Sequence, residues 1–459
     1  MTGKLIVVSN RIPSGDIPSG GLVVALHAAL AETGGIWIGS ASETGTPSET
    51  FETIGATPYQ RLAFRLSPEE EENYYLGFAN SVLWPLFHRR GDLVDVRAEY
   101  EADYIGVNRR LARMIAELAQ PDDLLWIHDY HFLPLAHFLR ELGVTCRIGF
   151  FLHIPFPNTA DLGVLPNPVD FAEWIAAYSL VGLQTRADVA RCLEMFRADP
   201  RAEFMTNGSV KFGKRFVSVL SFPIGIDVED FARAADVAEP NIFGSEHPGE
   251  FIIGVDRLDY SKGLPNRFLA FERYLENRTK DRRPTLIQIA PPTREAVAAY
   301  QDIRQELEVI SGHVNGRFAE LDWTPIRYIH RPVDRAQIAT LFRKARACLV
   351  TSMADGMNLV AKEFVAAQDP DDPGVLILSR FAGAAEDMTD ALSVNPYDLD
   401  DIAQAIEIAL TMDLAERQER QGACLEVVRK TDVAIWSKSF LSRLSAQPRV
   451  IPDVYRNAG

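Results

Sequence analysis

Hydrophobic positions along the chain fall into short apolar runs that alternate with longer segments of helical periodicity. Apolar runs rich in β-branched residues are typical of buried strands, and amphipathic stretches of ten or more residues are typical of helices. In the first half, this pattern predicts strands at 4–8, 124–127, 147–152 and 179–183 and helices at 22–32 and 107–118. Such an alternation indicates an α/β fold with helices packed on parallel sheets.

The same alternation begins again after an irregular stretch, 222–250, that is rich in Pro, Gly, Asp and Glu. The second half predicts a helix at 266–276 and strands at 251–255, 286–289, 326–329, 347–351 and 375–378. Two successive α/β halves predict two Rossmann-like domains that face each other across a cleft. We expect one domain at 1–225 and the other at 226–436, with a C-terminal helix at about 437–459 that crosses back to the first.

Length and charge support this organisation and exclude several classes of function. A chain of 459 residues, 47% of them hydrophobic, is too long for one ordinary core. The formal net charge of −16 repels nucleic-acid phosphate and anionic lipid, and the sequence has no basic patch that would overcome it. No apolar run approaches the roughly 20 residues that span a bilayer. We therefore expect neither a nucleic-acid partner nor a membrane.

The spacing of the cysteines indicates the cellular compartment of the protein. The four cysteines are far apart and form no CxxC pair: Cys146, Cys192, Cys348 and Cys424. Such spacing is typical of reduced core cysteines and predicts a cytoplasmic location.

The first candidate for chemistry lies after the first predicted strand. Arg11 ends that strand, and Gly20 and Gly21 then open a helix. Glycine lets a ligand approach the backbone closely, and the first N–H groups of a helix favour an anion. The pattern is not GxGxxG, so it gives little support to a dinucleotide site. An ordinary tight loop beside a surface arginine explains the same residues.

An aromatic segment at 74–88 forms the second candidate, with five aromatic rings in fifteen residues. Tyr75 and Trp84 each combine an apolar ring with a polar atom, which suits the two kinds of surface on a sugar. A helix buried in the core is the alternative. The Trp84-Pro85 step is expected to interrupt a helix, and it therefore favours a binding site.

The third candidate lies where two neighbouring strands end. Asp129 follows one strand, and His153 follows the next. Ligands of open α/β sheets bind at the carboxyl ends of strands, so Asp129 could orient a hydroxyl and His153 could bond a donor sugar. A metal bound by His128, His131 and His153 is the rival hypothesis, but no HExxH spacing or acidic cluster supports it. For His128 and His131, a structural role is favoured over catalysis.

A cationic loop after the predicted strand at 251–255 is the fourth candidate. Arg257 and Lys262 lie in this loop, where they could clamp a diphosphate and neutralise a nucleoside-diphosphate leaving group. A salt bridge from Arg257 to Asp256 or Asp259 is the alternative.

The fifth candidate opens a helix after another predicted strand. The N–H groups of Asn358, Leu359 and Val360 would lie at the helix N-terminus, where they favour an anion. Asp355 could bind sugar hydroxyls, and Glu363 could accept hydrogen bonds from a ribose. Simple N-capping by Asp355, with Glu363 in solvent, is the alternative.

Taken together and in order, these motifs resemble the trehalose-6-phosphate synthase family of retaining glycosyltransferases. The resemblance extends from about Leu5 to about Leu441, and its strings are 7–11, 128–131, 153–157, 257–263 and 355–363, with 381–385 and 394–398 in addition. It implies the GT-B architecture and transfer of glucose from UDP-glucose, or another NDP-glucose, to glucose 6-phosphate with retention, forming trehalose 6-phosphate. It also implies small-molecule substrates, no cofactor and no bound metal.

The resemblance also implies roles for individual residues. The catalytic residues would be Asp129, His153, Arg257 and Lys262. The acceptor would be bound by Arg11, Tyr75, Trp84, Asp129 and Arg294. The donor would be bound by Gly21, His153, Arg257, Lys262, Asp355, Asn358, Leu359, Val360 and Glu363.

Three segments depart from the family pattern: 40–42, 352–354 and 330–334. They leave the nucleotide base and the exact acceptor open. Another phosphorylated acceptor such as glycerol 3-phosphate, or a catalytically silent sugar-phosphate sensor, is the alternative function, and a metal-dependent hydrolase is a more distant one. The residues by themselves do not establish the anomeric outcome, the regulation, or whether the protein is a homo-oligomer.

Overall fold

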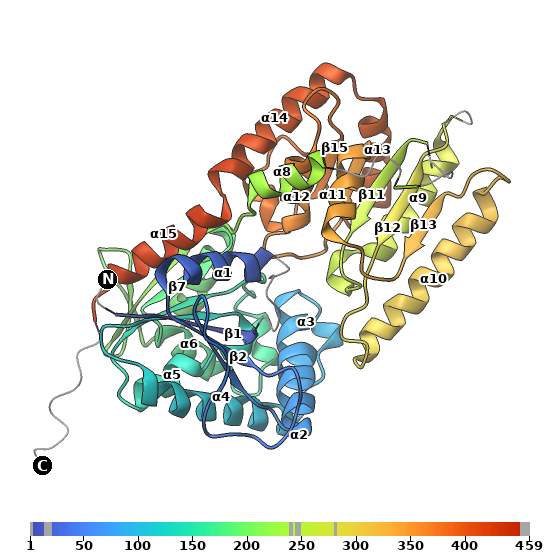
Figure 1. Cartoon of the computed structure of the whole chain (residues 1–459). Helices are drawn as coiled ribbons and strands as arrows, with labels where there is room; N and C mark the ends of the chain where they lie inside the picture. Colours follow the sequence, from blue (N-terminus) through green and yellow to red (C-terminus); the bar gives the residue numbers. More distant parts are fainter. Residues whose placement is uncertain (1–2, 13–20, 238–241, 244–248, 280–281, 450–459) are drawn as a thin grey trace, which may run out of the picture. The chain divides into compact units, whose positions relative to one another are not determined.

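Two compact units make up the chain in a computed structural model that describes residues 3–12, 21–237, 242–243, 249–279 and 282–449 (Figure 1). The first unit combines 1–223 with 434–459, and the second is 224–433. No helix in the described part of the chain is long and apolar enough to cross a membrane.

The first unit is built on a ten-stranded sheet in the order β3-β4-β2-β1-β5-β6-β7-β10-β9-β8. Its strands are β1 (Leu5–Arg11), β2 (Ile36–Ser40), β3 (Glu52–Gly55), β4 (Gln60–Phe64), β5 (Leu124–His128), β6 (Arg147–Phe151), β7 (Leu180–Leu183), β8 (Ala202–Phe204), β9 (Val210–Phe212) and β10 (Arg215–Ser221). From β4 to β10 every neighbouring pair is parallel, and β3, β8 and β9 add antiparallel edges. The carboxyl ends of β1, β5 and β6 therefore lie side by side.

The helices of this unit are α1 (Gly21–Thr33), α2 (Pro68–Glu70), the π-helix η1 (Glu71–Leu83), α3 (Trp84–Phe87), α4 (Ala98–Leu118), α5 (Leu135–Glu141), α6 (Pro168–Ala176), α7 (Arg186–Ala198) and α15 (Val433–Ser445). Short 3₁₀ turns are η2 (Gly91–Leu93), η3 (Tyr130–Phe132) and η4 (Asp161–Val164). α15 packs on the sheet through Phe440, whose ring stacks on Trp126 of β5 with the ring centroids 4.8 Å apart. The C-terminal part of the chain therefore belongs to the core of the first unit. The expected helix at 437–459 extends in part beyond the described residues.

The second unit has a six-stranded parallel sheet in the order β13-β12-β11-β14-β15-β16. Its strands are β11 (Phe251–Val255), β12 (Thr285–Ile289), β13 (Ile326–Ile329), β14 (Ala347–Val350), β15 (Val375–Ser379) and β16 (Leu392–Val394). Its helices and turns are α8 (Val228–Asp236), η5 (Tyr260–Lys262), α9 (Leu264–Asn277), α10 (Ala298–Phe318), α11 (Arg335–Lys344), α12 (Leu359–Ala367), η6 (Gly383–Glu386), α13 (Leu399–Thr411) and α14 (Leu414–Lys430). The strand order reverses direction between β11 and β14, so this is where a ligand site is expected.

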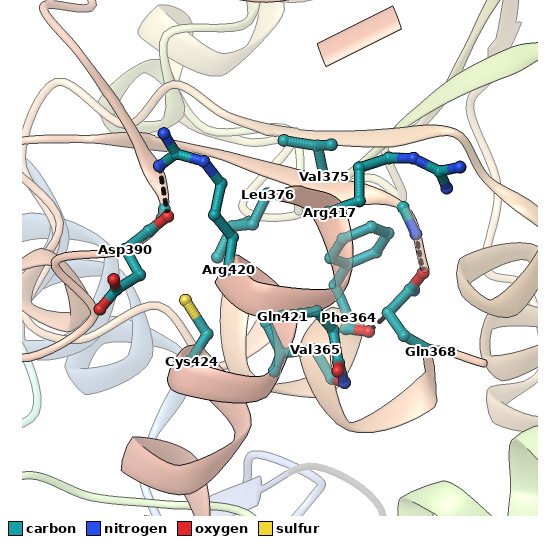
Figure 2. Close-up of a pocket in the computed structure, with 12 residues that line it drawn as sticks. Phe364, Val365, Gln368, Val375, Leu376, Asp390, Arg417, Arg420, Gln421 and Cys424 are labelled. Carbon is teal, nitrogen blue, oxygen red and sulfur yellow. Dashed lines mark hydrogen bonds between the residues drawn. The ribbon is translucent and has the colours of Figure 1, made fainter. Parts of the chain in front are cut away.

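Packing in the second unit leaves little space behind α12. The cavity there has a volume of about 10 Å³ and lies among Phe364, Leu376, Gln421 and Cys424 (Figure 2). That volume holds about one water molecule at most. This side of α12 is therefore core.

Three local predictions are wrong. The stretch 222–250 is not irregular throughout, because α8 lies within it with Asp227 as its N-cap. The helix predicted at 107–118 is present, but it begins nine residues earlier, at Ala98, because Tyr100 and Tyr104 also bury one face of that segment. The Trp84-Pro85 step does not interrupt the helix, which runs continuously from Pro68 to Phe87.

The π-helix explains why proline is tolerated there. In a π-helix each N–H bonds five residues back, and the N–H of Trp84 bonds the carbonyl of Ala79. Pro85, which has no N–H to donate, is the second residue of α3 and directly follows this wider turn. Two side chains reinforce the wider turn, since Asn80 Nδ2 and Ser81 Oγ donate to carbonyls five residues earlier, at 2.7 and 2.8 Å.

We predict that Gly149→Ala destabilises the first unit, because a Cβ there would lie 2.8 Å from the Phe440 ring of α15. Overpacking of this kind costs about 1–3 kcal/mol. Gly106→Ala is the matched control, since its added methyl group meets nothing within 4 Å in the exposed face of α4. It should stabilise the helix by about 0.5–1 kcal/mol. Urea unfolding measures both, and equal effects of the two changes would contradict the packing of α15.

Candidate functional site

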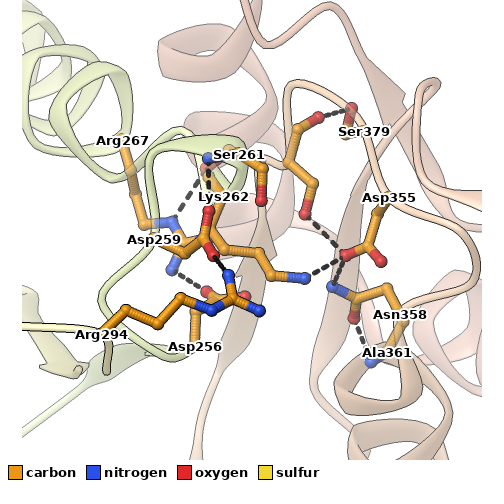
Figure 3. A network of polar contacts seen from close by, with 12 residues as sticks. Asp256, Asp259, Ser261, Lys262, Arg267, Arg294, Asp355, Asn358, Ala361 and Ser379 are labelled. Carbon is orange, nitrogen blue, oxygen red and sulfur yellow. Dashed lines mark hydrogen bonds and ion pairs between the residues drawn. The ribbon is translucent and has the colours of Figure 1, made fainter. Parts of the chain in front are cut away.

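A network of charged side chains lies beyond the carboxyl ends of β11 and β14 in the second unit (Figure 3). Lys262 Nζ is 2.6 Å from Asp355 Oδ2, and the two side chains are 15% and 12% exposed. The same carboxylate oxygen accepts hydrogen bonds from Asn358 Nδ2 at 3.0 Å and from Ser352 Oγ at 3.2 Å. The network therefore brings together Lys262, Asp355 and Asn358, as the sequence predicts.

Asn358 sets the geometry at the start of α12. It is the N-cap, and its Oδ1 accepts the N–H of Ala361 at 3.0 Å. The alternative in which Asp355 caps the helix is therefore wrong. The N–H groups of Leu359 and Val360 occupy the first two helical positions, where an α-helix supplies no acceptor of its own. Asn358 has a φ of +80°, which is uncommon for a residue other than glycine and typical of functional sites.

Glu363 lies one turn further along α12 and is half-buried, so the alternative of a fully solvated side chain is wrong. Burial raises the pKa of its carboxyl to about 7, and the positive charge of Arg335 partly opposes this shift. A carboxyl group with a pKa near neutrality can accept or donate a hydrogen bond.

A fully buried arginine, Arg267, joins the segments next to the cationic loop. Arg267 Nη1 lies 2.8 Å from Asp256 Oδ2 and 2.7 Å from Gln288 Oε1, and its Nε donates to Thr351 Oγ1 at 2.9 Å. Burial raises the pKa of Asp256, while Arg267 lowers it. Arg267 thus joins the ends of β11, β12 and β14. Arg267 was not among the predicted site residues, although an arginine on the apolar face of a predicted helix was a usable signal.

Arg294 is held by a second buried carboxylate. Tyr300 OH donates to Asp259 Oδ2 at 3.0 Å, and Arg294 Nη1 lies 2.6 Å from the same hydroxyl and 3.5 Å from Asp259 Oδ2. Asp256 therefore pairs with Arg267 and Asp259 with Arg294, and Arg257 is an exposed residue. Beside Arg294 the surface is hollowed, with a volume of about 340 Å³ lined by Thr293, Tyr300, Arg304, Glu308 and neighbouring residues.

Arg11, Tyr75 and Trp84, which are predicted to bind the acceptor substrate, belong to the first unit. The guanidinium of Arg11 lies 5.1 Å from the centre of the Tyr75 ring, and that ring stacks on His131. Trp84 is only 5% exposed and packs against His88 and Tyr130, so most of its ring belongs to the core. Arg294, another of the predicted acceptor-binding residues, belongs to the second unit.

Asp129 and His153 lie together at the ends of β5 and β6. The backbone N–H of His153 is 3.3 Å from Asp129 Oδ1. Asp129 has a φ of +73°, a second position where a residue other than glycine adopts an uncommon backbone. His153 Nε2 lies 3.1 Å from Nδ1 of His128, and burial lowers the pKa of His153 to about 3. His153 is therefore a neutral imidazole at physiological pH.

These histidines do not form a metal site. Within the described ranges, no group of three or more His, Cys, Asp or Glu side chains is arranged to hold a metal ion.

Gly21 is the first residue of α1, and the loop before it, 13–20, lies outside the described residues.

Solved structures define the class of protein. A structure of the Escherichia coli protein with UDP-2-fluoro glucose bound superposes with a TM-score of 0.94 at 42% identity, covering 98% of this chain and 100% of that one. A Burkholderia xenovorans trehalose-phosphate synthase in complex with glucose-6-phosphate gives 0.90 at 42% identity, covering 97% and 100%. The fold is that of a GT-B glycosyltransferase, with two Rossmann-like domains.

The chain belongs to glycosyltransferase family 20, whose family model matches residues 9–446. The trehalose-6-phosphate synthases of Klebsiella pneumoniae and Cronobacter sakazakii are each 44% identical to it over 450 residues, covering 96% of this chain and 95% of theirs. The protein is therefore an enzyme, a glycosyltransferase of this family.

We predict that Glu363→Gln removes part of the pH dependence of stability. The folded-state pKa of about 7 lies above the ordinary 4.5, so the folded protein keeps a proton that the unfolded chain loses. The stability from the neutral carboxyl is therefore complete below pH 4.5 and is lost as the pH rises through 7. The variant should be more stable than the parent at pH 8, by on the order of 1–2 kcal/mol for a half-buried group, and little different at pH 4. Denaturant unfolding at both pH values measures this, and parallel pH profiles would contradict it.

Proposed function

We propose that the enzyme transfers glucose from UDP-glucose to glucose 6-phosphate with retention, forming trehalose 6-phosphate. The observation that carries this proposal is the paired Lys262 and Asp355 beside the open N-terminus of α12. A cation and a carboxylate at one helix start match the two halves of a nucleotide sugar, since the diphosphate needs positive charge and the sugar needs acceptors for its hydroxyls. The relatives named above bind a UDP-sugar analogue and glucose 6-phosphate, which supports the same substrates here.

The donor would be held mainly by the second unit. Arg257 and Lys262 would contact the diphosphate together with the N–H groups of Leu359 and Val360, and Asp355 would accept hydrogen bonds from the sugar. Asn358 keeps both Asp355 and the helix start in position through its two side-chain hydrogen bonds. Glu363 would bind the ribose hydroxyls, and Gly21 would let the donor approach the backbone of α1.

The acceptor phosphate would be bound by Arg11, Tyr75, Trp84 and Arg294. Asp129 would orient the acceptor sugar, and His153 would bond the donor sugar. A neutral His153 suits this role, since it supplies a directed hydrogen bond without a charge that would compete for the diphosphate.

Catalysis in this proposal rests on position and charge. Arg257 and Lys262 would stabilise the negative charge that builds up on the leaving diphosphate as the glycosidic bond breaks. The departing phosphate oxygen would take the proton of the acceptor hydroxyl on the same face of the sugar, which gives retention. Neither a cofactor nor a bound metal is required by this scheme.

We also propose a cytoplasmic location. All four cysteines are free and buried in the structure, and burial raises the pKa of the Cys146 thiol to about 11. Buried thiols that form no disulfides suit a reducing compartment.

Product formation by the purified protein tests the proposal. UDP-, GDP- and ADP-glucose are each combined with glucose 6-phosphate and with glycerol 3-phosphate, and the products are separated and identified. Turnover of UDP-glucose with glucose 6-phosphate is expected. Turnover only with glycerol 3-phosphate would identify that compound as the acceptor. Binding of both ligands without any turnover would identify a sensor.

We predict that Lys262→Ala lowers kcat by about 30- to 1,000-fold, the loss expected when one placed electrostatic donor of about 2–4 kcal/mol is removed. Lys430→Ala is the matched control, because Lys430 is an exposed lysine that pairs with Glu426 on α14. Steady-state kinetics measures both variants. Near-normal turnover of Lys262→Ala would show that Lys262 does not act on the leaving group.

We predict that Arg294→Ala raises the KM for glucose 6-phosphate by about tenfold or more, since a charge-assisted hydrogen bond contributes about 1.5–3 kcal/mol. The KM for UDP-glucose should change little. Arg304→Ala controls for the loss of a nearby exposed arginine. A larger effect on the donor KM than on the acceptor KM would assign Arg294 to the other substrate.

A further inference from the structure

His128 and His153 share one hydrogen bond inside the first unit, with His128 Nδ1 3.1 Å from His153 Nε2. Burial lowers the pKa of both rings, with a further reduction for His128 from its neighbour. Each ring therefore carries one proton at neutral pH. One of the two facing nitrogens must donate and the other must accept, and this choice fixes the tautomer of both residues.

The two arrangements present different groups to a ligand. If His128 Nδ1 donates, His153 carries its own proton at Nδ1 and offers a donor. If His153 Nε2 donates, its Nδ1 is a bare acceptor, and His128 carries a proton at Nε2. His128 is completely buried, whereas His153 is partly exposed. Only His153 can therefore contact a ligand, either with a donor or with an acceptor at Nδ1.

The surroundings of His128 decide between the two. Its ring lies 4.5 Å from Trp126 and 6.3 Å from Trp436, measured between ring centroids. In the described part of the chain, His128 Nε2 and the indole N–H groups of both tryptophans are buried without hydrogen-bond partners. Indole N–H groups can only donate, so a proton on His128 Nε2 would add a third unpaired donor to this aromatic pocket.

A bare Nε2 on His128 avoids that arrangement. Unpaired buried N–H groups are rarer in proteins than acceptors with an unused lone pair. His128 then carries its proton at Nδ1 and donates it to His153 Nε2.

We propose that His128 is a positioning residue that holds His153 as its Nδ1–H tautomer, so that His153 presents a hydrogen-bond donor to the nucleotide sugar. The group it would recognise is an oxygen acceptor of that ligand, either a sugar hydroxyl or a phosphate oxygen. This inference rests on the proposed function for the identity of the ligand, but the tautomer itself is a property of the free protein. It gives His128 a part in binding that the sequence did not indicate.

The tautomer is measured directly by ¹⁵N NMR of protein labelled at histidine, without substrate. His153→Asn identifies the signals of His153 by their loss. The expected result is an N–H type shift at Nδ1 of His153 and a bare-nitrogen shift at its Nε2. The reversed pattern would overturn the proposal, whatever the enzyme activity, so this result is separate from failure of the proposed function.

Two substitutions of His128 test the consequence for binding. His128→Asn keeps an amide N–H close to the position of Nδ1, whereas His128→Phe keeps an aromatic ring and removes the donor. We expect His128→Phe to raise the KM for UDP-glucose by about tenfold, the change that one hydrogen bond contributes, with His128→Asn recovering most of it. His153 should show a mixture of tautomers in the phenylalanine variant. Equal KM values for the two variants would contradict a positioning role, and if His128→Phe does not fold, the NMR result on the parent protein still decides the inference.

Discussion

Buried carboxylates beside the carboxyl ends of parallel strands are the constraint on which the candidate site depends. Asp256 and Asp259 are buried there and the side chain of Asp355 is 12% exposed, and a charge removed from water is costly unless it is paired. Each has a partner from another segment of the second unit: Arg267 of α9, Arg294 with Tyr300, and Lys262 (Figure 3). These pairs restrict the loops to one arrangement. The cations are therefore placed before any phosphate arrives, which lowers the cost of ordering them on binding.

The first unit meets a different requirement with different chemistry. Its candidate site contains a neutral histidine pair, one carboxylate at a strained backbone position, and Arg11 over the ring of Tyr75. Neutral groups give direction to hydrogen bonds with sugar hydroxyls, whereas diphosphate binding requires charge. Under the proposed function, this division explains why the two units carry such different side chains at the same edge of similar sheets. It also explains why burial is tolerated at His128, which stays uncharged.

Local signals predicted most of the fold and much of the site. Apolar runs such as 251–255 became central strands, and Lys262, Asp355 and Asn358 met because each follows the end of a strand in a parallel sheet. The π-helix could not be predicted, since the apolar pattern does not tell hydrogen bonding five residues back from the usual four. Nor could the partners of Asp256 and Asp259, because Arg267 and Tyr300 reach them only through tertiary packing. The short strands β8 and β9 lack apolar runs long enough to signal a strand.

Binding of the diphosphate at the N-terminus of α12, beside Lys262, is the feature on which the proposed function depends most. The most direct measurement is the NMR chemical shift and solvent exchange of the backbone amides of Leu359 and Val360 during titration with UDP, with uridine as the control that lacks phosphate. Large shifts and slowed exchange of these two amides are expected with UDP, and little change is expected with uridine. Amides that respond equally to both ligands, or to neither while UDP binds, would contradict it.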